Sequence, residues 1–69
     1  MMALVDALVA ILAREGLPPG DRTALGLTHL VRAFPGFGEG VTKTAINAAL
    51  YKTPDRFQSS VEPGGMAPI

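Results

Sequence analysis

Three residues whose side chains suit a phosphate-rich polymer stand at intervals of four in the sequence: Lys43, Asn47 and Tyr51. In a helix, which turns by about 100° per residue, they fall at relative angles of about 0°, 40° and 80°, while Ile46 and Ala49 fall near 300° and 240°. Lysine offers a point charge to phosphate, asparagine donates and accepts hydrogen bonds, and tyrosine offers an aromatic face to a nucleobase. The spacing therefore predicts an outward face with the chemistry of nucleic-acid binding.

Each of these residues also has an ordinary structural explanation. An exposed lysine is commonly a solvated charge, an asparagine in a helix is commonly incidental, and a tyrosine at a helix end commonly covers the core. The hypothesis of binding depends on the joint placement of all three, beside which the hydroxyl of Thr44 adds a further contact to phosphate. That placement depends in turn on the helices and strands that the rest of the pattern predicts.

The first apolar stretch predicts a helix that stops at Gly16. Its apolar residues recur at helical spacing: Leu4, Val5, Leu8, Val9, Ile11 and Leu12. The run 3–13 is too short for a membrane span, is interrupted by Asp6, and lacks the basic start and cleavage site of a secretory signal. We therefore expect a core helix, with no membrane partner, in an intracellular protein of the cytoplasm, nucleus or nucleoid.

The next segment, residues 16–20, holds two prolines between glycines. This composition predicts an extended turn rather than a helix, with one short β-bridge residue at Leu17. A second helix should begin near Asp21 or Thr23, because the side-chain oxygen of either residue can cap free backbone N–H groups.

The second helix has a predicted buried stripe at spacing i, i+3, i+4, i+7: Leu27, Leu30, Val31 and Phe34. Gly26 inside this helix costs up to about 1 kcal/mol relative to alanine, which indicates close contact with another helix or a broken first turn. Pro35 ends the run. We expect Phe34 and Phe37 to hold the following glycine-rich connector on the core.

A third helix should follow Gly40 and end at Tyr51 or Lys52, with Thr42 or Thr44 as its cap. Its inward residues are predicted to be Ile46, Ala49 and Leu50. These residues would hold the helix to the body of the protein, so that the residues at positions 43, 47 and 51 point outward.

The remaining residues predict a β-hairpin. Residues 53–56 form a turn, after which Phe57, Ser59 and Val61 alternate with Gln58 and Ser60 in the pattern of a half-buried strand. Residues 62–65 predict a second turn, and residues 66–69 the start of a returning strand. Three helices followed by a hairpin predict an α+β fold of the small winged helix-turn-helix type, as one domain over residues 1–69 that is truncated at its last wing strand.

Composition limits the remaining classes of function. The 69 residues, 48% of them hydrophobic, suffice for one core, and the absence of cysteine excludes disulfides and thiolate metal sites. The net charge of zero argues against a tight, non-specific nucleic-acid binder. Between residues 41 and 60, however, Lys43, Lys52 and Arg56 stand against Asp55 alone, which suits a modest local site.

The sequence contains no pattern that is typical of an enzyme active site or a metal site. His29 is the single histidine, without other ligands at metal-binding spacing, and we expect it at a helix surface or edge. The serines and threonines have no histidine in a plausible triad relationship, and the acidic residues are scattered. The glycines at 36, 38 and 40 lack the preceding strand and the Gly-Lys-Ser/Thr of a phosphate loop. We predict no enzyme, no metal and no cofactor.

The segment 43–51 resembles the third helix of the Zα family, winged-helix domains that bind left-handed Z-DNA and Z-RNA. The family's helix reads Lys-x-x-Ile-Asn-x-x-Leu-Tyr, and every one of these positions matches. The resemblance implies that Lys43 contacts phosphate, that Asn47 hydrogen-bonds the zigzag backbone, partly through water, and that Tyr51 packs against a syn guanine. It also assigns Pro68 to the last proline of the binding wing, with Ala67 where another proline is usual.

The sequence departs from this family at several positions. Ala48 replaces a basic residue that often follows the asparagine, and the family's wing tryptophan would come directly after Ile69. The stretch Thr53–Phe57 is more similar to the LOTUS (OST-HTH) and HARE-type winged helices, which bind RNA or contact proteins. Three hypotheses therefore stand: a binder of double-stranded Z-form DNA or RNA, a binder of ordinary DNA or RNA, and a protein-interaction module that forms a homodimer or contacts other domains of a parent protein.

Overall fold

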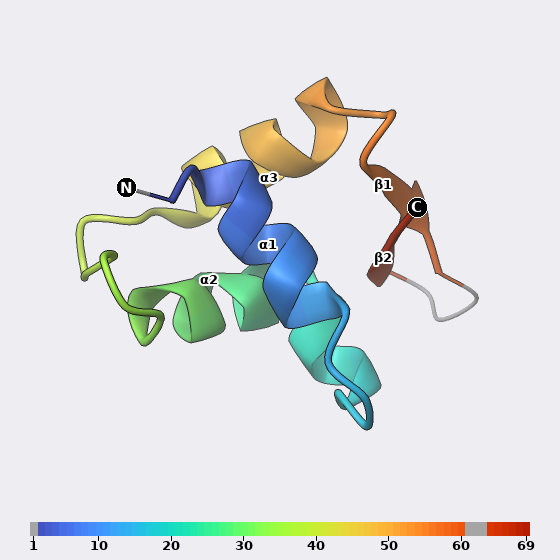
Figure 1. Ribbon diagram of the computed structural model, residues 1–69, viewed down its shortest axis with the longest axis horizontal. Coiled ribbons are helices and arrows are strands. Elements are labelled where there is room, and N and C mark those ends of the chain that lie inside the picture. The colour runs from blue at the N-terminus through green and yellow to red at the C-terminus, as the bar shows by residue number, and fades with distance from the viewer. Residues whose placement is uncertain (1, 61–63) are drawn as a thin grey trace.

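A computed structural model of the protein describes residues 2–60 and 64–69. Its elements are α1 (Leu4–Leu12), the 3-10 helix η1 (Pro19–Arg22), α2 (Ala24–Arg32), α3 (Lys43–Lys52), β1 (Phe57–Ser59) and β2 (Met66–Pro68) (Figure 1). Three α-helices followed by two antiparallel strands confirm the predicted α+β order. The predictions for Val61 and for the turn at residues 62 and 63 lie outside the described residues.

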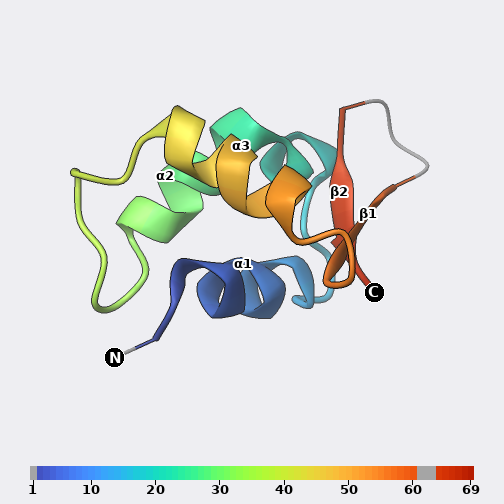
Figure 2. The same ribbon diagram turned by 90° about the horizontal axis from the view of Figure 1, so that it is seen from above.

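The three α-helices enclose one hydrophobic core. In Figure 2, α1 lies on one side and α2 and α3 lie together on the other, and α3 packs against both. The core consists of Leu8, Ile11 and Leu12 from α1, Leu27 and Val31 from α2, Ile46 and Leu50 from α3, and Phe57 and Met66 from the strands. The helical stripes are confirmed in part, because some of the predicted apolar residues only pack at the margin of the core: Leu4, Val5, Val9, Leu30, Phe34 and Ala49. Phe34 lies beyond α2, which ends at Arg32.

The segment between α1 and α2 differs from its prediction. Gly16 turns the chain with a φ of 73°, but Leu17 belongs to no strand or bridge, and Pro19–Arg22 form a 3-10 helix instead of an extended turn. Proline is compatible with the first turn of a helix, because its fixed φ is already helical and the missing N–H has no partner to lose there. The backbone N–H of Asp21 donates to the carbonyl oxygen of Pro18 at 3.0 Å and closes the turn.

The start of α2 depends on Thr23 and Gly26. Thr23 is the cap, since its Oγ1 accepts from the backbone N–H of Gly26 at 3.1 Å. A Cβ added at Gly26 would lie 2.7 Å from the Cα of Asp21 and closer still to the carbonyl oxygen of Gly20. The glycine therefore lets η1 pack against α2, which confirms the expected close approach of another helical segment.

The connector after α2 is held as predicted. Phe34 and Phe37 both pack against the core, with their rings edge to face and their centroids 6.2 Å apart. Gly36 between them has a φ of 91°, a conformation that L side chains rarely adopt, so glycine is required at this turn.

The two strands pair with Phe57 opposite Pro68, Gln58 opposite Ala67 and Ser59 opposite Met66. Phe57 and Met66 are buried, and β2 packs against α1. The predicted alternation stops after Phe57: Ser59 points to the same side of the strand but is exposed, although its partner Met66 is buried.

We expect Gly26→Ala to destabilise the protein by about 1–3 kcal/mol, although alanine is the better helix former, because the new methyl group meets backbone that cannot rotate away. The matched control is Gly20→Ala, whose added Cβ meets no atom within 4 Å. Urea unfolding followed by circular dichroism measures both. Equal midpoints for the two variants would contradict the packing constraint.

Candidate nucleic-acid interface

Helix α3 is fixed to the body through one side only. Ile46 and Leu50 are fully buried against α1 and α2, and Ala49 packs at the edge of the core. Burying a side chain of this kind contributes roughly 1.5–3 kcal/mol, so two of them are a substantial anchor in a domain of this size. The opposite side of α3 is left to solvent.

Both ends of α3 are capped by threonine hydroxyls. The Oγ1 of Thr42 accepts from the backbone N–H of Ala45 at 3.1 Å, which decides between the two predicted caps. At the other end, the Oγ1 of Thr53 donates to the carbonyl oxygen of Ala49. These caps fix the predicted bounds and hold the outward residues on regular helical turns.

The predicted site residues of α3 do lie on its solvent side. Lys43 and Thr44 are exposed, Asn47 is half-buried at the flank, and Tyr51 is 69% exposed. None of these four side chains forms a hydrogen bond or ion pair with any other residue that the structure describes. Their donors, acceptors and charge are therefore available to an external partner.

Pro68 does not share this face. It lies half-buried on β2, opposite Phe57, and its carbonyl oxygen accepts from the side-chain amide of Gln58 at 3.4 Å. The β1–β2 sheet lies beside the C-terminal end of α3 (Figure 1). Pro68 therefore belongs to a surface next to the exposed face of α3 and not to that face. The structure thus brings together four of the five predicted site residues.

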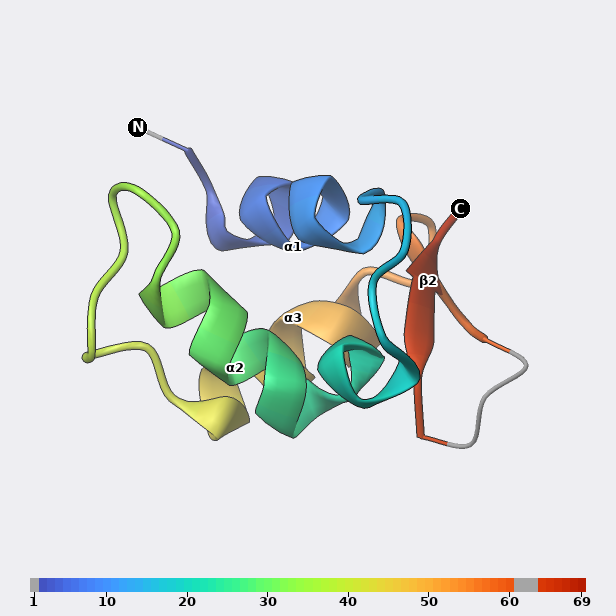
Figure 3. The ribbon, with the colours of Figure 1, turned by 90° about the horizontal axis from the view of Figure 1, so that it is seen from below.

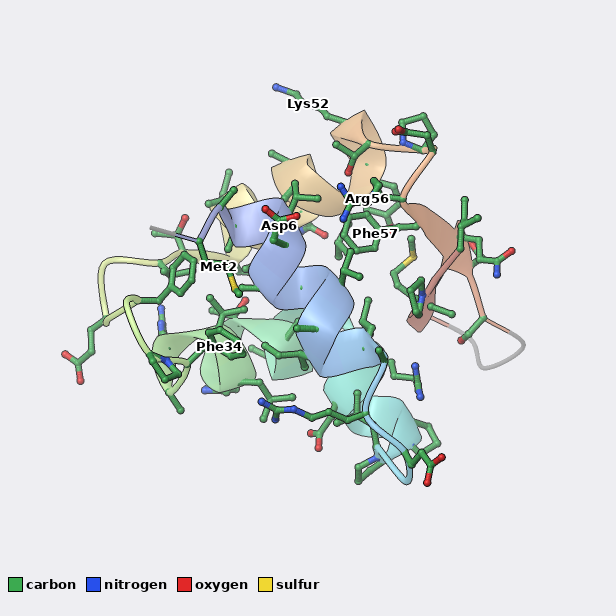
Figure 4. The ribbon with its side chains drawn as sticks, in the orientation of Figure 1. Met2, Asp6, Phe34, Lys52, Arg56 and Phe57 are labelled. Atoms are coloured by element: carbon green, nitrogen blue, oxygen red, sulfur yellow. The ribbon has the colours of Figure 1, made fainter. Side chains whose placement is uncertain are left out.

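The local positive charge is smaller than the sequence count indicates. Arg56 forms an ion pair with Asp6 of α1, with 3.3 Å between Nη2 and Oδ1, and the two side chains point toward one another in Figure 4. They are 43% and 51% exposed, so the pair contributes at most about 1 kcal/mol, but it occupies the charge of Arg56. Lys43 and Lys52 have no such partner among the described residues.

One cation near α3 was not predicted. Arg32 lies on the last turn of α2, and its Nε donates to the carbonyl oxygen of Val41 at 2.9 Å. Val41 lies two residues before the start of α3. No sequence periodicity relates two residues nine positions apart across a glycine-rich connector, so only the folded chain reveals this contact.

Other kinds of site have little support in the described part of the chain. His29 is exposed on α2, as expected. Across residues 2–60 and 64–69, no three histidine or acidic side chains gather as a metal site would require. Within the same residues, no helix has the length and apolar character needed to cross a membrane.

Comparison of the chain with family models, with curated proteins and with solved structures found no match.

We expect Tyr51→Ala and Lys43→Ala each to change the free energy of unfolding by less than about 0.5 kcal/mol, because these side chains are exposed and make no internal polar contact. The control, Leu50→Ala, removes a buried side chain from the same helix and should cost about 2–5 kcal/mol. Thermal unfolding followed at the helical band compares the three. A loss of stability in Tyr51→Ala as large as that in Leu50→Ala would assign the tyrosine to the core.

Proposed function

We propose that this protein is a winged-helix nucleic-acid-binding domain of the Zα type, with α3 as its recognition helix and the β1–β2 sheet as its wing. The observation that carries the proposal is the outward group on α3: Lys43, Thr44, Asn47 and Tyr51, with side chains unpaired among the described residues. The order of elements and the one-sided burial of α3 support it. The sequence match over residues 43–51 supports the choice of ligand.

In this proposal, Lys43 and Thr44 bind phosphate oxygens at the start of α3. Asn47, one turn further, offers an amide that can donate to one backbone oxygen and accept from a water or sugar hydroxyl. Tyr51 presents an unobstructed ring for packing against a base. The helix reads the spacing and shape of the backbone, so that selectivity comes from the conformation of the nucleic acid.

The left-handed form is costly to make, so the domain acts by shifting a population. A protein that binds Z-form better than B-form moves the equilibrium only by its differential affinity for the two. The few unpaired cations on α3 attract any duplex weakly. The contacts of Asn47 and Tyr51 supply the difference in affinity between Z-form and B-form.

Titration of an alternating guanine–cytosine duplex with the protein should invert the long-wavelength circular dichroism bands of the DNA, because capture of Z-form depletes B-form. Asn47→Ala and Tyr51→Ala should lose the inversion while keeping the helical signal of the protein. Arg14→Ala, which removes an exposed cation that lies outside α3, is the control and should retain it.

Binding to ordinary duplex or single strands without inversion, weakened steeply by salt, would instead assign a LOTUS- or HARE-like function. No binding to any nucleic acid, with a dimer in sizing experiments, would assign a protein-interaction module.

A second prediction concerns Ala48, which is half-buried on the same side of α3, between the turns that carry Thr44 and Tyr51. Ala48→Lys should raise affinity and steepen the dependence of log K on log salt by about 0.9, because it adds one phosphate contact. Ala10→Lys, on the exposed side of α1, is the control and should change neither quantity. An equal gain in both variants would indicate attraction by net charge without a defined site.

A further inference from the structure

A shallow groove of about 630 Å³ lies where the last turn of α2 meets the connector to α3. Its lining residues are His29, Arg32, Ala33 and Glu39. In Figure 3 this end of α2 and the connector lie at one end of the long axis, close to the start of α3. The site proposed on α3 does not use this groove.

The guanidinium of Arg32 lines the groove and makes one hydrogen bond to the backbone. Its Nε donates to the carbonyl oxygen of Val41 at 2.9 Å, and no hydrogen bond to a described residue uses its two terminal nitrogens. Val41 precedes Lys43 by two residues, a separation of at most about 7 Å along the chain. The carbonyl oxygen of Val41, two residues before the start of α3, thus orients the guanidinium of Arg32.

Arg32 forms no ion pair with any described residue. Glu39 lines the same groove, yet no ion pair joins it to Arg32, and the one ion pair among the described residues joins Asp6 to Arg56. Arginine binds phosphate through parallel N–H donors, a geometry that the bond to Val41 leaves free. An anion that enters the groove meets these donors, with the carboxylate of Glu39 opposing it.

We propose that this groove receives a further phosphate of the nucleic-acid strand whose neighbouring phosphates bind Lys43 and Thr44, with Arg32 as the donor. The inference rests on the proposed function of α3 and extends the contact surface from α3 to α2. The role of Val41 is to orient the guanidinium, and the role of Glu39 is to limit affinity for ordinary polyanions.

The test measures binding of a fluorescently labelled alternating guanine–cytosine duplex by anisotropy between 50 and 200 mM salt (about the range over which phosphate contacts are resolved). Arg32→Gln keeps a donor for Val41 but removes the charge. It should lower affinity roughly five- to tenfold near 0.1 M salt and reduce the slope of log K against log salt by about 0.9. Glu39→Gln should raise affinity severalfold without changing the fold.

Arg14→Gln is the matched control, because Arg14 is exposed in the segment 13–17, at the opposite end of the molecule from the connector (Figures 1 and 3). It should leave affinity and slope unchanged. Arg32→Lys separates binding from stability, because it keeps the positive charge but replaces the planar guanidinium. The slope of log K against log salt should therefore be retained even where the melting temperature falls.

Wild-type slopes in Arg32→Gln would overturn the inference while leaving the proposed function of α3 in place, and would assign Arg32 to holding the connector. Equal losses in Arg32→Gln and Arg14→Gln would also overturn it, because they indicate an effect of net charge. Absence of duplex binding by the wild-type protein would overturn both proposals.

Discussion

The burial of Ile46 and Leu50 between α1 and α2 is the contact on which the remaining structure depends. A ten-residue helix with a weakly apolar sequence would be marginal alone, so these contacts hold it in place. Because they occupy one side of α3, Lys43 and Tyr51 on another side remain exposed and Asn47 is only half-buried. The exposed face is thus a direct consequence of how the helix is anchored.

Several further contacts fix the positions of α2 and α3 relative to the rest of the protein. A short chain with one core and no cysteine gains limited stability from packing, so contacts that hold its connectors matter. Arg32 ties the start of α3 to α2, and Asp6 ties the turn after α3 to α1 through Arg56. The close packing of η1 on Gly26 fixes where α2 begins. The contacts of Arg32 and Arg56 limit the freedom of α3 at its two ends.

The sequence predicts the helices well because their apolar periodicity is a local property, and the caps at Thr23 and Thr42 follow from local chemistry. It does not predict η1, since two prolines fit an extended turn and the first turn of a helix equally well. It also misses the contacts of Arg32 and Arg56, which join residues that are far apart in sequence. The face on α3 was therefore predictable, whereas the charges around it required the folded chain.

The balance of charge in this protein has a consequence for selectivity. Affinity for any polyanion grows with the number of phosphates neutralised, irrespective of sequence or conformation. With six basic and six acidic residues, and with Arg56 engaged by Asp6, this general attraction is small. Contacts that depend on conformation, such as those proposed for Asn47 and Tyr51, then make up a larger share of the binding free energy. A neutral domain can on this ground discriminate between forms of a duplex better than a strongly basic one, at the expense of affinity.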